Sequence, residues 1–552
     1  MIDSLNTAQS GLYASKFAIE NIMNNIANEA TPGYKKRVAN IAELSHTDSR
    51  VAGRGVEIST ASRVTNMFMY DTLISQQSKS AYYDEESTML GDIESFFYES
   101  DDSGFSNDFD RFTQAMENLR VSPQNQTNKN ILKELGSTVV QDLQTIYNNL
   151  EDKQLSLKKT AYENVEAING FLYDIGEVNE QIGQSSEVSN DLLDRRDYLE
   201  SQLAKYIDIE VDRSNDYQLK IGGQVAVRYN TNIHNVKVVE GYTKQIDYYS
   251  VSGTTGDLTY RFNGIASVTG QGNTDLAKIT DLVNKINASE EMKKVISARV
   301  ENGNLVIESK IEGLNGEFDG VLISSNNEIA KNPQSKSAED DFHIEIFDTE
   351  LNIQGGMLKA KVDNLDTENA NNKIQNYKDM LDNFAKAMAD MTAGYISGDN
   401  GTYDASGSTD YLNEYSGSSQ FQTIGLFQGS SIKTLSFNNA ALSDISQEDL
   451  DYLAGLQWSE NVKFADNTTT SFNKYYQILQ VSVASDKESI DFKKNTQESV
   501  TESLKSNYEK IIKVDKDEEM ILLMQFQAAY EASAKLVTIV DELLQTILGM
   551  KR

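Results

Sequence analysis

Most of the residues in this 552-residue chain that could bind a metal ion or catalyse a reaction are acidic. Two segments, residues 101–110 and 399–404, hold several aspartates within a few positions, and oxygen ligands of this kind suit hard cations such as Ca²⁺. Neither segment has the spacing of an EF-hand loop, so we expect solvated turns rather than metal sites there. Among 84 acidic residues, no carboxylate pair for acid–base catalysis stands out.

Most other catalytic chemistry lacks the residues it needs. The absence of cysteine excludes disulfides, thiolate metal sites and thiol nucleophiles. The three histidines, His46, His234 and His343, are far apart in the sequence, which disfavours histidine-dependent catalysis. Phosphate-binding glycine loops, nucleophile elbows and zinc-protease helices are absent as motifs. We therefore expect no enzyme and no cofactor, and we expect Trp458 and Phe464 to be core residues.

Charge and hydropathy limit the partners. The net charge of −34 repels nucleic acid and anionic lipid, and no stretch of 18 apolar residues is present to span a membrane. The first 15 residues contain no basic residue and no unbroken apolar run, unlike a cleaved secretory signal peptide. A protein that is exported without a cleaved signal peptide has an N-terminal sequence of the same kind.

Both ends of the chain carry helical heptad patterns. Near the N-terminus the apolar residues are Leu5, Leu12, Ile19, Ile22 and Ile26, on a helix predicted to end near Asn28. Near the C-terminus they are Leu523, Phe526, Tyr530, Val537, Val540 and Leu544. Since the chain has three prolines, we predict long helices between these ends, over residues 67–97, 105–119, 127–182, 190–207, 361–391 and 471–514.

The centre of the chain changes character, with frequent glycines and strand-like runs between residues 209 and 357. Predicted strands cover residues 217–221, 236–239, 259–262, 295–300, 305–309 and 342–347, with a single short helix at 276–286. We therefore predict a multidomain α+β protein, in which a long coiled-coil-like helical bundle formed by both termini flanks a β-rich central insert. The predicted domains are the terminal helices (1–35 and 515–552), a helical bundle (36–208 and 358–514), and a β-rich outer domain (209–357) with a sub-insert at about 250–340.

The terminal stripes allow two interpretations. Each helix packs on its own domain, or the two helices pair with each other and then with neighbouring copies. Full burial of a large stripe residue contributes roughly 1.5–3 kcal/mol, whereas an isolated helix is marginal in water. A narrow stripe therefore needs a partner, and the second interpretation predicts an assembling protein.

Two short segments carry a family resemblance. Residues 24–35 (Asn-Asn-Ile-Ala-Asn-Glu-Ala-Thr-Pro-Gly-Tyr-Lys) resemble the N-terminal signature of bacterial flagellar axial proteins, which comprise rod, hook and hook-associated proteins. Residues 517–520 and 525–535 resemble the matching C-terminal signature. The family pattern often has Arg at the position of Lys36, a departure that keeps the charge.

Further segments are similar to the hook–filament junction branch of this family. Residues 190–199 (Asn-Asp-Leu-Leu-Asp-Arg-Arg-Asp-Tyr-Leu) resemble a characteristic stretch of that branch, and residues 217–221 continue the similarity. Residues 260–264, 282–287 and 303–307 resemble an insertion motif of flagellins and hook-associated proteins.

The resemblance implies a structural role. A subunit of this kind leaves the cell unfolded through the flagellar type III export channel, with a chaperone bound to its C-terminal amphipathic segment. It is then extracellular without a cleaved signal peptide, and it assembles with other copies of itself at the distal end of the hook. Its terminal helices join the inner tube and the β-rich middle projects outward. The implied neighbours are hook protein and the third hook-associated protein.

Candidate residues follow from these expectations. We predict an assembly interface made of the eleven stripe residues named above, and an inter-domain turn at Thr31, Pro32, Gly33 and Tyr34. Asn24, Asn25 and Asn28 are expected to make capping and loop hydrogen bonds. The alternatives are a hook or distal-rod protein, a secreted surface adhesin whose insert binds a ligand, and an enzyme located in the insert.

Overall fold

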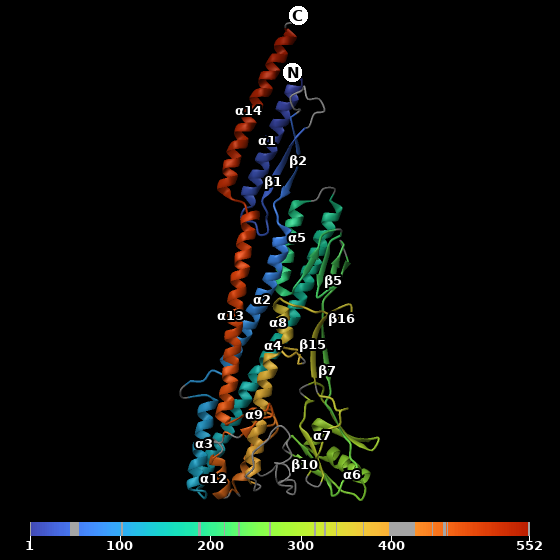
Figure 1. The fold of residues 1–552 in the computed structure, drawn as a ribbon, viewed down its shortest axis with the longest axis vertical. Helices are drawn as coiled ribbons and strands as arrows, with labels where there is room; N and C mark the ends of the chain where they lie inside the picture. The colour runs from blue at the N-terminus through green and yellow to red at the C-terminus, as the bar shows by residue number, and fades with distance from the viewer. Residues whose placement is uncertain are drawn as a thin grey trace.

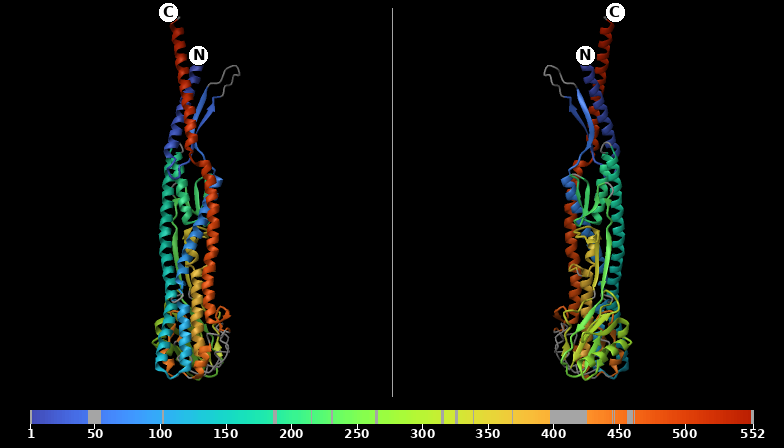
Figure 2. Two further views of the ribbon diagram at one scale, coloured as in Figure 1. Left: turned by 90° about the vertical axis from the view of Figure 1, so that its left-hand side faces the viewer. Right: turned by 90° about the vertical axis from the view of Figure 1, so that its right-hand side faces the viewer.

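The chain is a long rod whose two termini lie at the same end (Figure 1). The computed structural model describes residues 2–549 except 45–54, 101–102, 186–188, 215, 230–231, 264–265, 314–315, 325–326, 338, 368, 397–424, 444, 446, 456–459 and 461. Helices α1 (Ile2–Asn28) and α14 (Lys516–Gly549) form the narrow end of the rod. A wider body of helices and small sheets forms the rest (Figure 2). The predicted α+β fold class is confirmed.

Most body helices run along the rod. They are α2 (Met67–Phe96), α3 (Phe105–Val121), α4 (Gln126–Gln184), α5 (Asn190–Tyr206), α8 (Met357–Asp363), α9 (Lys373–Ile396), α12 (Gln447–Gly455) and α13 (Phe472–Ile512), with a 3-10 turn at Asn439–Leu442. Side-chain caps mark where they begin: Asn125 accepts hydrogen bonds from two amides of α4, and Ser471 accepts one from the Lys474 amide. The helices predicted over 67–97, 105–119, 127–182, 190–207 and 471–514 are confirmed within three residues at each end.

The main core lies between these helices and is rich in aromatic rings at the end of the rod away from the termini. The Phe384 ring of α9 lies 5.5 Å from both the Phe105 and Phe472 rings, centroid to centroid. Phe464 is fully buried and stacks on Tyr475 with the centroids 3.8 Å apart, which confirms its predicted place in the core. Trp458 lies outside the described residues.

Small antiparallel sheets replace the long helices in the centre of the chain. One sheet joins β3 (Glu210–Asp212), β4 (Gln218–Ile221), β5 (Gln224–Arg228) and β6 (Asn232–Ile233). A ribbon joins β7 (Lys237–Thr243), β15 (Glu339–Ile346) and β16 (Thr349–Glu350). Beyond it lie a sheet of β8 (Ile246–Tyr249), β11 (Ile296–Glu301) and β12 (Asn304–Ser309), and another of β9 (Leu258–Phe262), β10 (Ala266–Gly270), β13 (Gly320–Ser324) and β14 (Asn327–Ile329). Short hairpins elsewhere are β1 (Arg37–Glu43) with β2 (Val56–Arg63), β17 (Phe427–Gln428) with β18 (Ser436–Phe437), and β19 (Val462–Lys463) with β20 (Thr469–Thr470).

The outer part of the insert has its own hydrophobic core. Helix α6 (Asp275–Ala288) packs on β10 and β11, and Tyr260, Phe262, Leu282 and Ile307 are buried among them. The β7–β15 ribbon connects this unit to the body. The domain boundaries given above stay a prediction.

Three details of the secondary structure differ from expectation. The helix predicted over 361–391 is interrupted between α8 and α9, where two asparagine side chains bond to nearby backbone groups. Asn364 Nδ2 donates to the Ala360 carbonyl at the end of α8, and Asn372 Oδ1 accepts from the Gln375 amide as the cap that starts α9. The insert contains a second short helix, α7 (Met292–Val295). The β1–β2 hairpin was not predicted.

The buried carboxyl of Glu86 generates a pH prediction. It accepts a hydrogen bond from Asn364 Nδ2 at 2.6 Å, and burial, followed by the nearby Asp363, raises the pKa of Glu86 from 4.5 to about 8. The folded chain therefore holds a proton that the unfolded chain loses, so the free energy of unfolding falls as pH rises from about 5 to 8. We expect Glu86→Gln to remove this slope and to stabilise the protein at pH 8 by roughly 2 kcal/mol. Urea unfolding at pH 5, 7 and 8 measures it.

The exposed Glu94 on the same helix offers a matched control. Glu94→Gln is expected to leave the pH dependence of wild type unchanged. Equal slopes for wild type and Glu86→Gln would contradict the assignment.

Candidate assembly site

The chain leaves α1 through a tight turn at Thr31–Tyr34. The Thr31 amide donates to the Asn28 carbonyl, and the Tyr34 amide donates to the Thr31 carbonyl. Gly33 has φ +82°, and a Cβ at this position would lie 2.9 Å from Cβ of Tyr198 in α5. Glycine is therefore required twice, for the left-handed backbone and for the close approach to α5.

Asn25 is the centre of the hydrogen bonds around this turn. Its side chain is fully buried. Its Nδ2 donates to the Arg37 carbonyl at 2.9 Å and to Glu519 Oε2 at 3.1 Å, and its Oδ1 accepts from the Arg37 amide at 3.0 Å and from the Tyr34 hydroxyl at 2.9 Å. These four bonds use the full capacity of a side-chain amide. One residue thus ties α1 to the turn, to β1 and to α14.

The three basic residues after the turn point alternately to two different elements, as in an extended strand. Lys35 forms a buried ion pair with Asp197 of α5, and Arg37 pairs with Asp191 of the same helix. Lys36, between them, pairs with Glu518 Oε2 at 2.7 Å and Glu519 Oε1 at 3.3 Å in α14. Its amide donates to the Ile512 carbonyl at the end of α13. The segments that resemble the two family signatures are therefore in direct contact.

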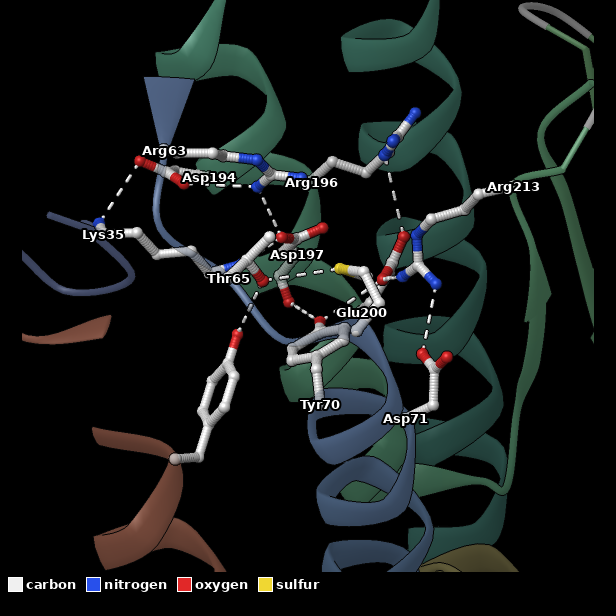
Figure 3. A network of polar contacts seen from close by, with 12 residues as sticks. Lys35, Arg63, Thr65, Tyr70, Asp71, Asp194, Arg196, Asp197, Glu200 and Arg213 are labelled. Atoms are coloured by element: carbon white, nitrogen blue, oxygen red, sulfur yellow. Dashed lines mark hydrogen bonds and ion pairs between the residues drawn. The ribbon is translucent and has the colours of Figure 1, made fainter. Parts of the chain in front are cut away.

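A buried ionic network continues along α5 (Figure 3). Arg63 NH1 lies 2.6 Å from Asp197 Oδ2 and 3.3 Å from Asp194 Oδ1. Further along, Glu200 pairs with Arg213 and accepts a hydrogen bond from the Tyr217 hydroxyl at 2.8 Å. Burial acts to raise the pKa of Asp197, but Lys35 and Arg63 outweigh it and hold that pKa below its ordinary value. We call the residues Asn25, Lys35, Lys36, Arg37, Arg63, Asp191, Asp194, Asp197 and Glu519 the neck network.

The terminal helices α1 and α14 pack side by side (Figures 1 and 2). Small residues at the contact allow a close approach: a Cβ added to Gly11 would lie 3.3 Å from Ser533 Oγ. Ile22 is buried in this contact region, while Leu5, Leu12, Ile19 and Ile26 are half-buried. On α14, Leu523, Phe526, Val537, Val540 and Leu544 are half-buried and Tyr530 is 37% exposed. The most buried α1 residues also include Ala8, Ala14 and Ala18.

Helix α14 has further apolar residues that the described part of the chain leaves about half exposed. They are Met520, Ile521, Met524, Leu536, Ile539, Leu543 and Ile547, each 47–60% exposed. At 100° per residue, these residues spread over about half of the helix circumference, and Ile539 near their centre lies about 160° around the helix from Val537 on the side that packs on α1. An apolar face of this length needs a partner to exclude water.

A polar cleft of about 980 Å³ separates the outer part of the insert from α4 and α9. Lys386 of α9 crosses it to Asp319 at 2.8 Å, and burial raises the pKa of Asp382 to about 7. Its charged side chains pair mostly with one another, as Lys433 does with Glu151 at 2.7 Å. Among the described residues, no group of three His, Asp or Glu side chains is placed to hold a metal ion. Residues 101–102 and 399–404 lie outside the part described.

The neck network is the feature of this site that the sequence patterns did not predict. Its signal is present in the sequence: Asp191, Asp194, Asp197 and Glu200 recur every three residues, so that each is a surface neighbour of the next on α5. The partners of the three aspartates, Lys35, Arg37 and Arg63, are remote in sequence, so only the structure brings them together. The expected capping role of Asn28 is confirmed, since its Nδ2 donates to the Asn24 carbonyl at 3.0 Å. None of the described helices is long and apolar enough to cross a bilayer.

Comparison with known proteins gives two family matches. Residues 90–264 match the family described as "Flagellar hook-associated protein FlgK helical domain", and residues 506–550 match "Flagellar basal body rod FlgEFG protein C-terminal". The first match includes α4, α5 and the acidic column of the neck network, and the second includes α14.

Similar whole proteins are also flagellar hook-associated proteins. Flagellar hook-associated protein 1 of Bacillus subtilis is 23% identical over 99% of this chain and 97% of its own length. The protein of that name from Salmonella typhimurium is 26% identical over 38% of this chain and 39% of its own length. The solved flagellar hook junction protein FlgK from Burkholderia pseudomallei aligns with a TM-score of 0.36 and 14% identity, covering 59% of this chain and 44% of that one.

The neck network generates a stability prediction. Asp197→Asn keeps the shape of the side chain but removes the buried counter-charge of Lys35 and leaves Arg63 with Asp194 alone. Breaking a buried pair of this kind costs about 3–5 kcal/mol, so we expect a loss of about 3 kcal/mol in the free energy of unfolding at pH 7, measured by urea titration. Because the folded pKa of Asp197 is lowered, its contribution is present above pH 4 and disappears as pH falls below that value.

The matched control is Asp152→Asn, which changes an exposed aspartate of α4 and is expected to change stability by less than about 0.5 kcal/mol. The account of the network is wrong if the two variants are equally stable at pH 7.

Proposed function

We infer that this chain, a member of the flagellar hook-associated protein 1 family, is a structural subunit of the bacterial flagellum that forms the junction between hook and filament. The observation that carries the inference is the pair α1–α14. One side of α14 packs on α1, and apolar residues over about half of its circumference stay about half exposed in the described part of the chain. A helix with two apolar faces is suited to a tube in which neighbouring copies supply the missing contacts.

We propose a separate role for each part of the rod. The terminal helices (1–35 and 515–552) form the inner tube with those of neighbouring copies, including the eleven stripe residues as an assembly interface. The turn Thr31–Tyr34 and the neck network then fix the direction in which the helical body leaves the tube. The β-rich region, at the side of the body and towards the end opposite the termini, projects outward.

The proposed partners are other copies of this chain, hook protein on one side and the third hook-associated protein on the other. An export chaperone bound to the C-terminal segment explains how the exposed face of α14 avoids aggregation before assembly, since such a face is an association hazard in water. We propose an extracellular location reached without a cleaved signal peptide. We also propose that the chain is not an enzyme, because the polar cleft between the insert and α4 and α9 holds ion pairs rather than a nucleophile with its base.

The exposed face of α14 provides the test. The triple variant Leu536→Asp, Ile539→Asp and Leu543→Asp changes residues that are already at least half exposed, so the monomer is expected to fold with unchanged helicity by circular dichroism. Three buried charges in a subunit interface are incompatible with assembly. We expect cells to make hooks without filaments and to release unassembled flagellin, as seen by electron microscopy and fractionation. Deletion of residues 520–552 is expected to give the same result.

A matched triple variant, Gln527→Asp, Thr538→Asp and Gln545→Asp, changes exposed polar residues of the same helix that lie about 100–180° around it from Leu536, Ile539 and Leu543, and it is expected to keep filaments. Full filaments with the apolar-face variant incorporated would contradict the proposed function. Location of the protein along the hook shaft or rod, rather than at the hook tip, would favour a hook or distal-rod subunit instead.

A further inference from the structure

Helix α4 carries an exposed glycine that the fold of the monomer does not explain. Gly170 lies in the interior of this 59-residue helix, where glycine is less favourable than alanine. A Cβ at Gly170 would meet no atom within 4 Å. Since nothing within the described chain requires the missing side chain, the reason for it lies outside the monomer.

The side of α4 around Gly170 has the composition of a contact surface. Tyr162 and Tyr173 flank Gly170 on this side and are 46% and 63% exposed, and tyrosine is enriched in protein interfaces. The Tyr162 hydroxyl donates to Glu240 of β7, and its ring meets Phe342 of β15 edge-on, so only its outer edge is free for a further contact. The stretch 160–184 contains acidic residues and no Lys or Arg. Its acidic residues are Glu163, Glu166, Asp174, Glu177 and Glu180, all exposed.

Helix α13 presents a complementary surface. Its side opposite α2 carries Phe492, which is 73% exposed, then the small residues Ser499, Ser503 and Ser506, and then Lys510 near the end of the helix. Lys513 follows and is also exposed. This surface therefore changes from aromatic to small to basic towards the neck.

The two surfaces lie at the same level of the rod. Helix α13 ends where the Ile512 carbonyl accepts a hydrogen bond from the Lys36 amide. Helix α4 ends six residues before α5 begins, and α5 contacts the same segment of chain through Asp191 and Arg37. Both helices run towards the neck, so counting back from their ends places Gly170 level with Ser499, Tyr162 level with Phe492, and Glu180 close to Lys510.

The two helices also lie on opposite sides of the helical body. In both views of the ribbon, the neck-side half of α4 and the neck-side half of α13 flank the other helices (Figures 1 and 2). A contact between them is therefore available only between two copies. Two different faces that meet in this way form a head-to-tail interface, which builds a ring or a helix rather than a closed dimer.

We propose that in the assembled junction the Gly170 face of α4 in one copy packs against the Ser499–Ser503 face of α13 in the next copy. The proposal rests on the proposed function and adds the lateral contact of the helical body. Glycine facing serine allows the two helix axes to approach closely. At one end of the contact Phe492 packs against the exposed edge of Tyr162, whose hydroxyl stays bonded to Glu240. At the other end Glu177 and Glu180 meet Lys510 and Lys513.

Cysteine cross-linking tests this contact directly, because the natural chain has no cysteine. The pair Gly170→Cys with Ser499→Cys, treated with a short bismaleimide in isolated hook–filament structures, is expected to give a ladder of dimers and larger multimers on denaturing gels. The control pair, Gly170→Cys with Ser485→Cys, uses a serine on the same side of α13 but about 21 Å further from the neck. It is expected to give at least tenfold less cross-linked product.

A second variant tests the contact without cysteines, in case a cysteine substitution itself prevents assembly. Gly170→Leu places a large side chain in open space in the monomer, so the Tm of the purified chain is expected to stay equal or to rise. The fraction of hooks that carry filaments is expected to fall at least tenfold, because the helices of neighbouring copies no longer approach.

The outcomes separate this proposal from the proposed function. Filaments that form normally with Gly170→Leu, or assembled structures in which the Gly170–Ser499 pair cross-links no better than its control, would overturn the α4–α13 contact and leave the junction role intact. Filament loss with the α14 apolar-face variant tests the junction role independently.

Discussion

The structure depends on keeping a group of buried charges and one buried amide paired with partners at the point where the terminal helices meet the body. Asn25 makes four hydrogen bonds from a fully buried side chain, and Lys35 and Asp197 are buried as an ion pair. Unpaired, such groups cost several kcal/mol each, so α1, α5 and α14 hold one relative position. A rigid neck of this kind transmits the orientation of the inner helices to the rest of the subunit.

The need to pair these buried groups also explains why segments that are remote in the sequence meet at the neck. The backbone after the turn is extended, so Lys35 and Arg37 reach α5 while Lys36 reaches α14. Gly33 adds a steric condition, since no larger residue fits against Tyr198. The two helices at the end of the rod and the helical body are thereby coupled, while the apolar outer face of α14 stays available for neighbouring copies.

Much of the helical architecture was predictable from local patterns. Heptad spacing at both ends, few prolines and the capping residues define α1, α4 and α13 to within a few residues. The break between α8 and α9 was missed because asparagine side chains compete with the backbone only once Glu86 and Lys373 are in place. The apolar stripes predicted pairing of the termini, yet Gly11 facing Ser533 sets the close contact, and small residues carry no hydrophobic signal. The partners of Asp197 come from segments more than 100 residues away, which no local pattern encodes.

Hydrogen exchange in Asn25→Ala tests the central claim that the neck network holds the terminal helices to the body. In the purified monomer, the amides of α1 and α14 are predicted to exchange at least tenfold faster than in wild type, while those of α3, α4 and α9 keep their rates. Unchanged exchange in α14 would contradict the account, and so would a uniform increase along the whole chain, because either result means that Asn25 does not couple these particular elements.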